Sequence, residues 1–163
     1  MRLAAPLAAL ALLIAPAAQA QIRNGAKPRA DDGVTYVKAD DPRMQAAIAK
    51  GRRTLPQFFA RLADPAPGDH GFIIKYDLLP GPKAEYIWAD VISHSPGVTI
   101  ARLANTPIDS RFKLGEKVSV DDAEIVDWGY YSGGVMQGNY TTRALLPSYS
   151  AADAEQIRKA FNW

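Results

Sequence analysis

The chain has 163 residues, a formal net charge of +2 and no cysteine. The lack of cysteine excludes disulfides, thiolate nucleophiles and thiolate metal ligands. Acidic and basic residues are interspersed without a polybasic block, which argues against nucleic acid or an anionic membrane as a partner.

The first twenty residues have the form of a secretory signal peptide. Arg2 precedes an uncharged apolar run from residue 3 to residue 15, and Ala18 and Ala20 are small residues at the two positions that a signal peptidase reads. The run is shorter than the about 20 residues that a membrane-spanning helix needs, so a retained anchor is the lesser alternative. We expect cleavage after Ala20, a periplasmic or secreted protein without a membrane span, and 163 − 20 = 143 mature residues, enough for one domain.

Residues 21–33 are polar and predict a flexible leader, followed by a single domain over residues 34–163. Residues 34–37 suggest a short edge strand. Asp40 or Asp41 before Pro42 is typical of a helix start. Apolar residues then recur at intervals of three and four, at Met44, Ala47, Ile48, Gly51, Leu55, Phe58, Phe59 and Leu62.

Proline at position 56 interrupts this apolar stripe. Because proline inside a helix removes a hydrogen bond and clashes with the preceding turn, the sequence predicts two helices. We expect them over residues 42–53 and 55–63, with Thr54 capping the second.

The pattern changes to a period of two after residue 71. Phe72, Ile74 and Tyr76 share one face of a predicted strand, and Lys75 and Asp77 share the other. Further strands are expected over residues 85–92 and 98–103, which complete an antiparallel meander, and a separate short strand is expected over residues 117–120.

The most distinctive stretch follows near the C-terminus. Residues 125–131 are rich in β-branched and aromatic residues and predict a strand, and residues 132–134 form a glycine turn that returns the chain through Val135 and Met136. Gly138 indicates a bulge or a close backbone approach. Ser150 followed by Asp153 resembles a capping box and predicts a final helix.

These elements predict an α+β fold. We expect two N-terminal helices packed on a curved antiparallel sheet of about five strands, plus a C-terminal helix.

The ordered set of residues between positions 41 and 143 resembles an uncharacterised bacterial family, domain of unknown function 2314, also called YegJ-like. The likeness is carried by Met44, Ala47, Thr54-Leu55-Pro56, Phe58, Phe72, Lys75, Glu85-Tyr86-Ile87-Trp88, Asn105, Pro107, Gly115, Val118, Ile125, Asp127-Trp128, Gly138, Tyr140, Thr141 and Arg143. Members often carry histidine where this chain has Tyr86, which weakens any mechanism that needs an imidazole there. The resemblance implies a fold and a bacterial origin, and it implies no activity.

One acid and one base stand out as candidates for a site. Asp127 is flanked by apolar residues and needs a partner, because burying an unpaired charge is costly, and Arg143 is the expected partner. With Tyr140 they could form a polar site whose arginine binds a carboxylate or a phosphate, or else a structural ion pair that fixes the return of the hairpin. Both readings stay open.

The remaining candidates each have a structural alternative as well. Trp88 and Trp128 could form an aromatic platform for a sugar or peptide, or simply be large pieces of the core. Asn105, before Thr106 and Pro107, could bind a ligand or be a turn residue that bonds its own backbone. The candidate ligand-binding set is Trp88, Asn105, Asp127, Trp128, Tyr140 and Arg143.

No motif in the sequence indicates a catalytic centre, a metal or a cofactor. His70 and His94 lack a metal-ligand spacing, and no serine lies in a nucleophile elbow. The sequence therefore favours a non-catalytic binding or interaction domain whose partner is a protein or a component of the cell envelope. The alternatives are a small cell-envelope hydrolase that uses carboxylates near Asp127, and a scaffold-like protein in which all of these residues are structural.

Overall fold

The structure is a computed structural model, and it describes residues 41–79 and 84–163. The predicted signal peptide, the leader and the strand at residues 34–37 lie outside these residues. In chain order the elements are α1 (Pro42–Ala63), β1 (His70–Asp77), β2 (Tyr86–Ser95), β3 (Val98–Leu103), β4 (Lys117–Asp121), η1 (Asp122–Glu124), β5 (Ile125–Ser132), β6 (Val135–Gly138), α2 (Tyr140–Leu145), η2 (Leu146–Ser148) and α3 (Ala151–Phe161).

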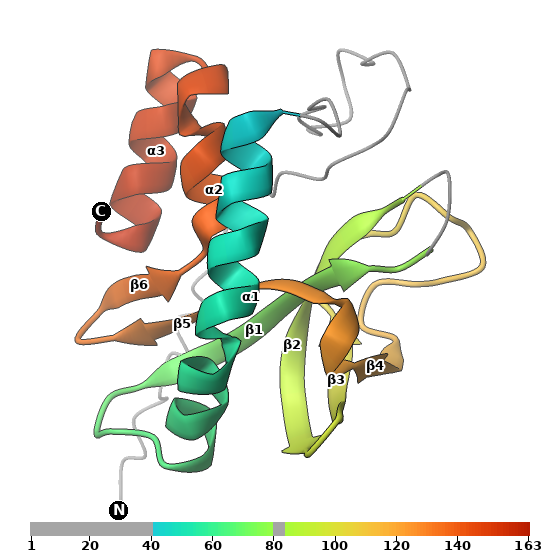
Figure 1. Cartoon of the computed structure of the whole chain (residues 1–163). Helices are drawn as coiled ribbons and strands as arrows, with labels where there is room; N and C mark the ends of the chain where they lie inside the picture. Colours follow the sequence, from blue (N-terminus) through green and yellow to red (C-terminus); the bar gives the residue numbers. More distant parts are fainter. Residues whose placement is uncertain (1–40, 80–83) are drawn as a thin grey trace, which may run out of the picture.

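The strands form one antiparallel sheet of six strands in the order β4-β3-β2-β1-β5-β6 (Figure 1). The meander from β1 to β4 runs outward on one side of β1, and the β5–β6 hairpin adds to its other side. The fold class is therefore α+β as predicted, with six strands in the sheet where about five were expected.

The N-terminal helix is one continuous element, which corrects the prediction of two helices. α1 runs through Pro56, and Asp41 caps its start by accepting from the backbone N–H groups of Arg43 and Met44. Thr54 caps nothing, because its hydroxyl donates to the carbonyl of Lys50 at 2.8 Å and accepts from the indole Nε1 of Trp128 at 3.1 Å. Packing against β5 therefore holds the helix together across a residue that on its own would end it.

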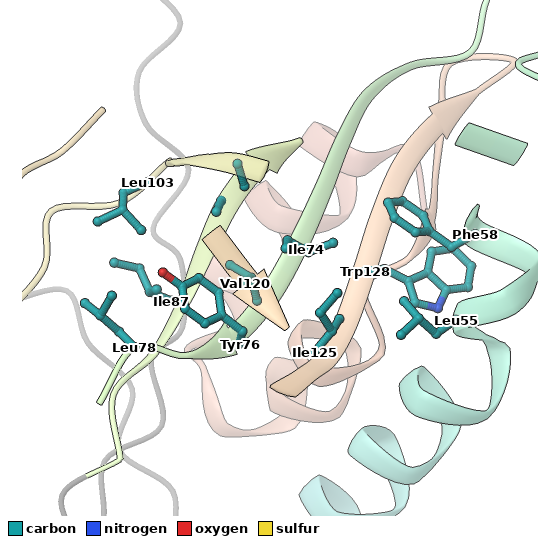
Figure 2. Close-up of a cluster of buried hydrophobic side chains, with 12 residues drawn as sticks. Leu55, Phe58, Ile74, Tyr76, Leu78, Ile87, Leu103, Val120, Ile125 and Trp128 are labelled. Carbon is teal, nitrogen blue, oxygen red and sulfur yellow. The ribbon is translucent and has the colours of Figure 1, made fainter. Parts of the chain in front are cut away.

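The main core lies between α1 and the sheet face that α1 covers (Figure 2). Its members alternate along the strands as the period of two requires, and α1 adds two of them. The buried cluster comprises Leu55, Phe58, Ile74, Tyr76, Leu78, Ile87, Ala89, Ala101, Leu103, Val120, Ile125 and Trp128. A second cluster joins the start of α1 to β5 and α2 through Met44, Ile48, Val126 and Leu145.

Two glycines allow the close contacts between these layers. A Cβ on Gly51 would lie 2.4 Å from the carbonyl oxygen of Val126, so α1 can approach β5 only with glycine at this position. Gly138 has φ +65° and faces the Trp128 ring, where a Cβ would lie 2.5 Å from a ring carbon. The close approach predicted at Gly138 is confirmed.

The C-terminal part contains one predicted helix and one that was missed. α3 begins at Ser150, whose hydroxyl accepts from the N–H of Asp153 and donates to its carboxylate, as in the predicted capping box. α2 was not predicted, since its residues Tyr140, Thr141 and Thr142 favour strands. Within the described residues, no helix is both long enough and apolar enough to cross a membrane.

Candidate functional site

Asp127 is the centre of the polar cluster that the structure builds from the predicted residues. It lies on β5, is 0% exposed, and stands directly opposite Lys75 of β1, which is also 0% exposed. The predicted alternation placed Lys75 on the same face as Asp77, and its burial was missed. The available signal was a lysine flanked by Ile74 and Tyr76.

The carboxylate of Asp127 accepts hydrogen bonds that organise the start of α2. Its Oδ2 accepts from the N–H and the hydroxyl of Thr141, both at 2.7 Å, and its Oδ1 accepts from the N–H groups of Trp128 at 2.9 Å and Tyr140 at 3.2 Å. Asn139 precedes the helix in the left-handed conformation and makes no capping bond with its own side chain. Asp127 therefore caps α2 from a strand more than ten residues earlier in the chain.

Thr141 connects the buried acid to the buried base. The Nζ of Lys75 lies 3.4 Å from the Thr141 hydroxyl oxygen, which in turn bonds Asp127. The same Nζ lies over the Trp88 ring, 5.3 Å from its centroid. The positive charge of Lys75 is therefore stabilised by a hydroxyl oxygen and an aromatic face as well as by the carboxylate of Asp127.

Burial changes the protonation of both charged groups. Desolvation lowers the pKa of Lys75 to about 8, and the field of Asp127 opposes the shift. Desolvation raises the pKa of Asp127, and the hydrogen bonds from Thr141 and Trp128 and the charge of Lys75 oppose that shift. In both cases removal from water is the largest effect.

The expected ion pair between Asp127 and Arg143 is wrong. The Nε of Arg143 donates to the carbonyl of Gly138 at 3.1 Å, its Nη2 donates to the carbonyl of Met136 at 2.9 Å, and its guanidinium lies 3.7 Å from the centroid of the Trp163 ring. Arg143 therefore holds the outer edge of β6 and the end of the chain, while Asp127 turns toward Lys75 and α2.

The other predicted site residues are separated by the fold. Trp88 is 2% exposed and Trp128 is 5% exposed, so neither presents a ring as a surface platform. The Oδ1 of Asn105 accepts from the N–H of Trp88 at 3.2 Å, which extends the β2–β3 pairing and replaces the expected bond to its own backbone. Tyr140 is half-buried with its ring edge against Trp128 and the Nζ of Lys50 over its face.

The two histidines lie apart and have separate contacts. His70 stacks on Tyr131, and its Nδ1 lies 2.9 Å from the carbonyl of Gly68. His94 stacks on Phe59 of α1, and its Nε2 lies 2.9 Å from the carboxylate of Asp122. The groups of three or more candidate metal-ligand side chains that a bound ion needs are absent from the described residues.

The carboxylate of Asp122 joins three parts of the β2–β4 region. Besides His94 it accepts from the Gly97 N–H at 3.0 Å and from the Thr99 hydroxyl at 2.9 Å. This acid therefore fixes the β2–β3 turn to the residue that follows β4.

Comparisons with known proteins identify a family for this chain but no activity. A family model described as an uncharacterised protein conserved in bacteria, DUF2314, matches residues 41–162. The chain is 27% identical over 88 residues to the uncharacterised protein YegJ of Escherichia coli strain K12, an alignment that covers 53% of this chain and 58% of YegJ. The chain thus spans a little over half the length of this relative. No solved structure matches. Since the family model extends over all of the described elements, from the cap of α1 to the end of α3, this chain belongs to the uncharacterised bacterial family DUF2314.

Proposed function

We propose that this protein is an exported, non-catalytic binding or interaction domain, and that its binding surface lies on strands β2 and β3. The surface, here called the open face, consists of Asp90, Ile92, Ile100 and Arg102. It is the side of these two strands that points away from the core. The observation that carries the proposal is the exposure of Ile92 beside two oppositely charged side chains, Asp90 and Arg102, on this face.

The strand register assigns these residues to one side of the sheet. Asp90 pairs with Arg102 across β2 and β3, while their neighbours Ala89, Ala101 and Leu103 are buried on the α1 side. Ile92 lies at the bulge between Val91 and Ser93 and is 46% exposed.

The chemistry of the open face suits recognition of another molecule. Partial burial raises the pKa of Asp90, and the nearby charge of Arg102 opposes that shift. An exposed isoleucine beside a carboxylate and a guanidinium offers apolar area together with two charges that fix orientation. A protein or a component of the cell envelope with an apolar group and complementary charges would fit it.

The hydrolase alternative receives less support. It needs an accessible carboxylate near Asp127, but Asp127 is 0% exposed and its oxygens accept bonds from Trp128, Tyr140 and Thr141. A group so fully engaged helps to fold α2, and a substrate could reach it only after local unfolding. We therefore infer a role for Asp127 in positioning the fold, and the open face is the surface to test.

Photo-crosslinking in the native cell tests the binding surface. A benzophenone amino acid at Arg102 should give a defined adduct with a protein or envelope component identified by mass spectrometry. The same amino acid at Lys159, which is exposed on α3, is the matched control and should give none. Equal labelling from both positions, or none from Arg102, would remove the open face as the binding surface.

Export is tested independently of binding. Cell fractionation followed by intact-mass analysis should find the protein in the periplasmic or secreted fraction, beginning at Gln21. A protein that begins at Met1 and stays with the cytoplasmic fraction would contradict this part of the proposal.

A further inference from the structure

Within the part of the chain that the structure describes, strand β4 pairs on one side only, with β3. The N–H of Leu103 donates to the Glu116 carbonyl at 2.9 Å, and the N–H of Asp122 donates to the Gly97 carbonyl at 3.2 Å. Because hydrogen-bonded residues alternate along an antiparallel pair, these bonds at the two ends of β4 direct the backbone groups of Val118 and Val120 toward β3. The N–H and C=O groups of Lys117, Ser119 and Asp121 therefore point away from the sheet.

The N–H and C=O groups of Lys117 and Ser119 make no hydrogen bond with any residue that the structure describes. Asp121 is the N-cap of η1, so its C=O accepts the first bond of that turn and only its N–H is left for another strand. The side chains of Lys117, Ser119 and Asp121 are also exposed, and Asp121 uses one carboxylate oxygen to accept from the N–H of Ala123. An edge of this kind is a template for another strand.

The opposite edge of the sheet is closed by side chains. On β6 the carbonyl of Met136 accepts from Arg143 and Trp163, and that of Gly138 accepts from Arg143. At the adjoining turn the carbonyl of Gly134 accepts from Asn162 at 2.7 Å. Among residues 41–79 and 84–163, side chains therefore protect the edge at β6 and leave the edge at β4 open.

We propose that a second copy of this chain pairs with the edge of β4, antiparallel and about a two-fold axis at Ser119. The sequence Lys117-Val118-Ser119-Val120-Asp121 is complementary to itself in this register. Lys117 lies opposite Asp121 of the second copy, and Asp121 lies opposite its Lys117. Ser119 meets Ser119, and Val118 meets Val120.

The hydrogen-bond pattern fits the same register. Lys117, Ser119 and Asp121 are the residues with outward backbone groups, so the Ser119 pair exchanges two backbone hydrogen bonds. In each Lys117–Asp121 pair the N–H of Asp121 donates to the C=O of Lys117, since the C=O of Asp121 serves η1. The opposite charges share one face of the joined sheet, where such cross-strand pairs are stabilising. The interface is isologous, which closes at two copies.

The dimer is expected to be weak, because β4 has five residues and a stable interface buries about 1,200–2,000 Å² in total. Association should therefore depend on protein concentration. Lys117 and Ser119 pair with Arg102 and Ile100 of the open face, whereas Asp121 pairs with Val98, which lies outside it. Asp121→Lys therefore distinguishes loss of the dimer from loss of partner binding.

Sedimentation velocity over a concentration series tests the proposal on the purified mature protein. The wild type should pass from monomer to dimer. Lys117→Asp alone and Asp121→Lys alone each place like charges opposite one another and should weaken the dimer by about tenfold. An equimolar mixture of these two variants restores opposite charges in both pairs and should form a heterodimer.

A proline variant tests the backbone pairing. The N–H of Ser119 points outward, so Ser119→Pro removes a bond to the second copy and none to β3, a position at which an edge strand accepts proline. Ser119→Pro should be monomeric and folded, while Ser119→Thr, which keeps the N–H, should still dimerise. A wild type that stays monomeric at every concentration, or a dimer unaffected by Ser119→Pro and by the charge reversals, would overturn the proposal.

Discussion

Asp127 has two roles in the fold, whereas the sequence suggested a single interaction, with Arg143. Its negative charge lies opposite the ammonium group of Lys75 in the β1–β5 pair. Its carboxylate oxygens also cap α2 by accepting hydrogen bonds from the N–H groups of Tyr140 and Thr141. A carboxylate removed from water persists in this way only when its oxygens are satisfied. Asp127 therefore has a structural role in this fold. Because it is buried, we expect substitutions at this position to lower the free energy of unfolding.

The first prediction compares Asp127 with Arg143. Asp127→Asn leaves Lys75 without its opposing charge and turns an amide N–H₂ toward buried donors, so it should lower the free energy of unfolding by about 3–5 kcal/mol. Arg143→Ala loses two hydrogen bonds to carbonyls and its contact with Trp163, and should lower it by about 1–3 kcal/mol.

The double variant separates this arrangement from a direct pair. Since the two side chains do not bond each other, the losses should add to within about 0.5 kcal/mol in denaturant unfolding. A strongly less-than-additive loss would mean that Asp127 and Arg143 do form the pair that the sequence suggested.

The second prediction concerns the pH dependence that Lys75 creates. Its pKa is about 8 in the folded protein and 10.5 in a free side chain. Between these values the unfolded chain binds more protons than the folded chain, so the free energy of unfolding should rise with pH. The rise amounts to roughly 3 kcal/mol at most.

The matched comparison is wild type against Lys75→Met, measured by urea unfolding from pH 7 to pH 10. Burial raises the pKa of Tyr76, Tyr86 and Tyr131, so their effect on stability sets in as the pH approaches 10, and the comparison cancels it because both proteins carry these tyrosines. The wild type should gain stability with pH relative to the variant. Parallel curves for the two proteins would show that Lys75 does not titrate in this range.

At the scale of elements, helix α1 is the clearest case of tertiary structure overriding a local signal. Proline in a helix interior removes one hydrogen bond and strains the preceding turn. The Trp128 indole offsets part of this loss by bonding the Gly51 carbonyl at 3.2 Å and the Thr54 hydroxyl, while Leu55 and Phe58 are buried on either side of the proline.

The third prediction follows from this continuity. Pro56 is exposed, so Pro56→Ala restores a backbone hydrogen bond without disturbing the core and should raise the free energy of unfolding by about 1–3 kcal/mol. The exposed neighbour Gln57→Ala is the control and should change it by less than about 0.5 kcal/mol. If a second helix began at residue 55, Pro56 would lie in its first turn, and its replacement would leave stability nearly unchanged.

At the scale of the whole molecule, the sheet is supported unevenly. β1 pairs with both β2 and β5, and α1 packs against the β5 side, while β4 and β6 lie at the edges (Figure 1). Opening β1 breaks two ladders and exposes core residues such as Ile74, whereas opening an edge strand breaks one ladder. The most stable unit is therefore the centre of the sheet together with α1.

The fourth prediction is the order of amide hydrogen exchange. At low protein concentration the slowest amides should belong to β1 and the adjoining part of β5, and those of Lys117, Ser119 and Asp121 should exchange fast because they point to solvent. Mass-spectrometric exchange with peptide resolution measures both. Slower exchange in β4 than in β1 would contradict this ranking of strand stability.

The sequence by itself determined the elements whose signals are local. The alternation from Phe72 to Tyr76, the strand at residues 98–103, the glycine turn before Val135 and the capping box at Ser150 all rest on neighbours within a few residues. Such patterns survive folding because nothing distant opposes them, and together they were enough to predict the α+β class.

Only the tertiary structure decided which distant groups meet. The partner of Asp127, the burial of Lys75, the passage of α1 through Pro56 and the formation of α2 each depend on contacts between residues far apart in the chain. A charge has no preference for one opposite charge over another until the strands fix the distances. The register of β1 against β5 sets those distances, and it places Lys75 opposite Asp127 while Arg143 turns to the edge of β6.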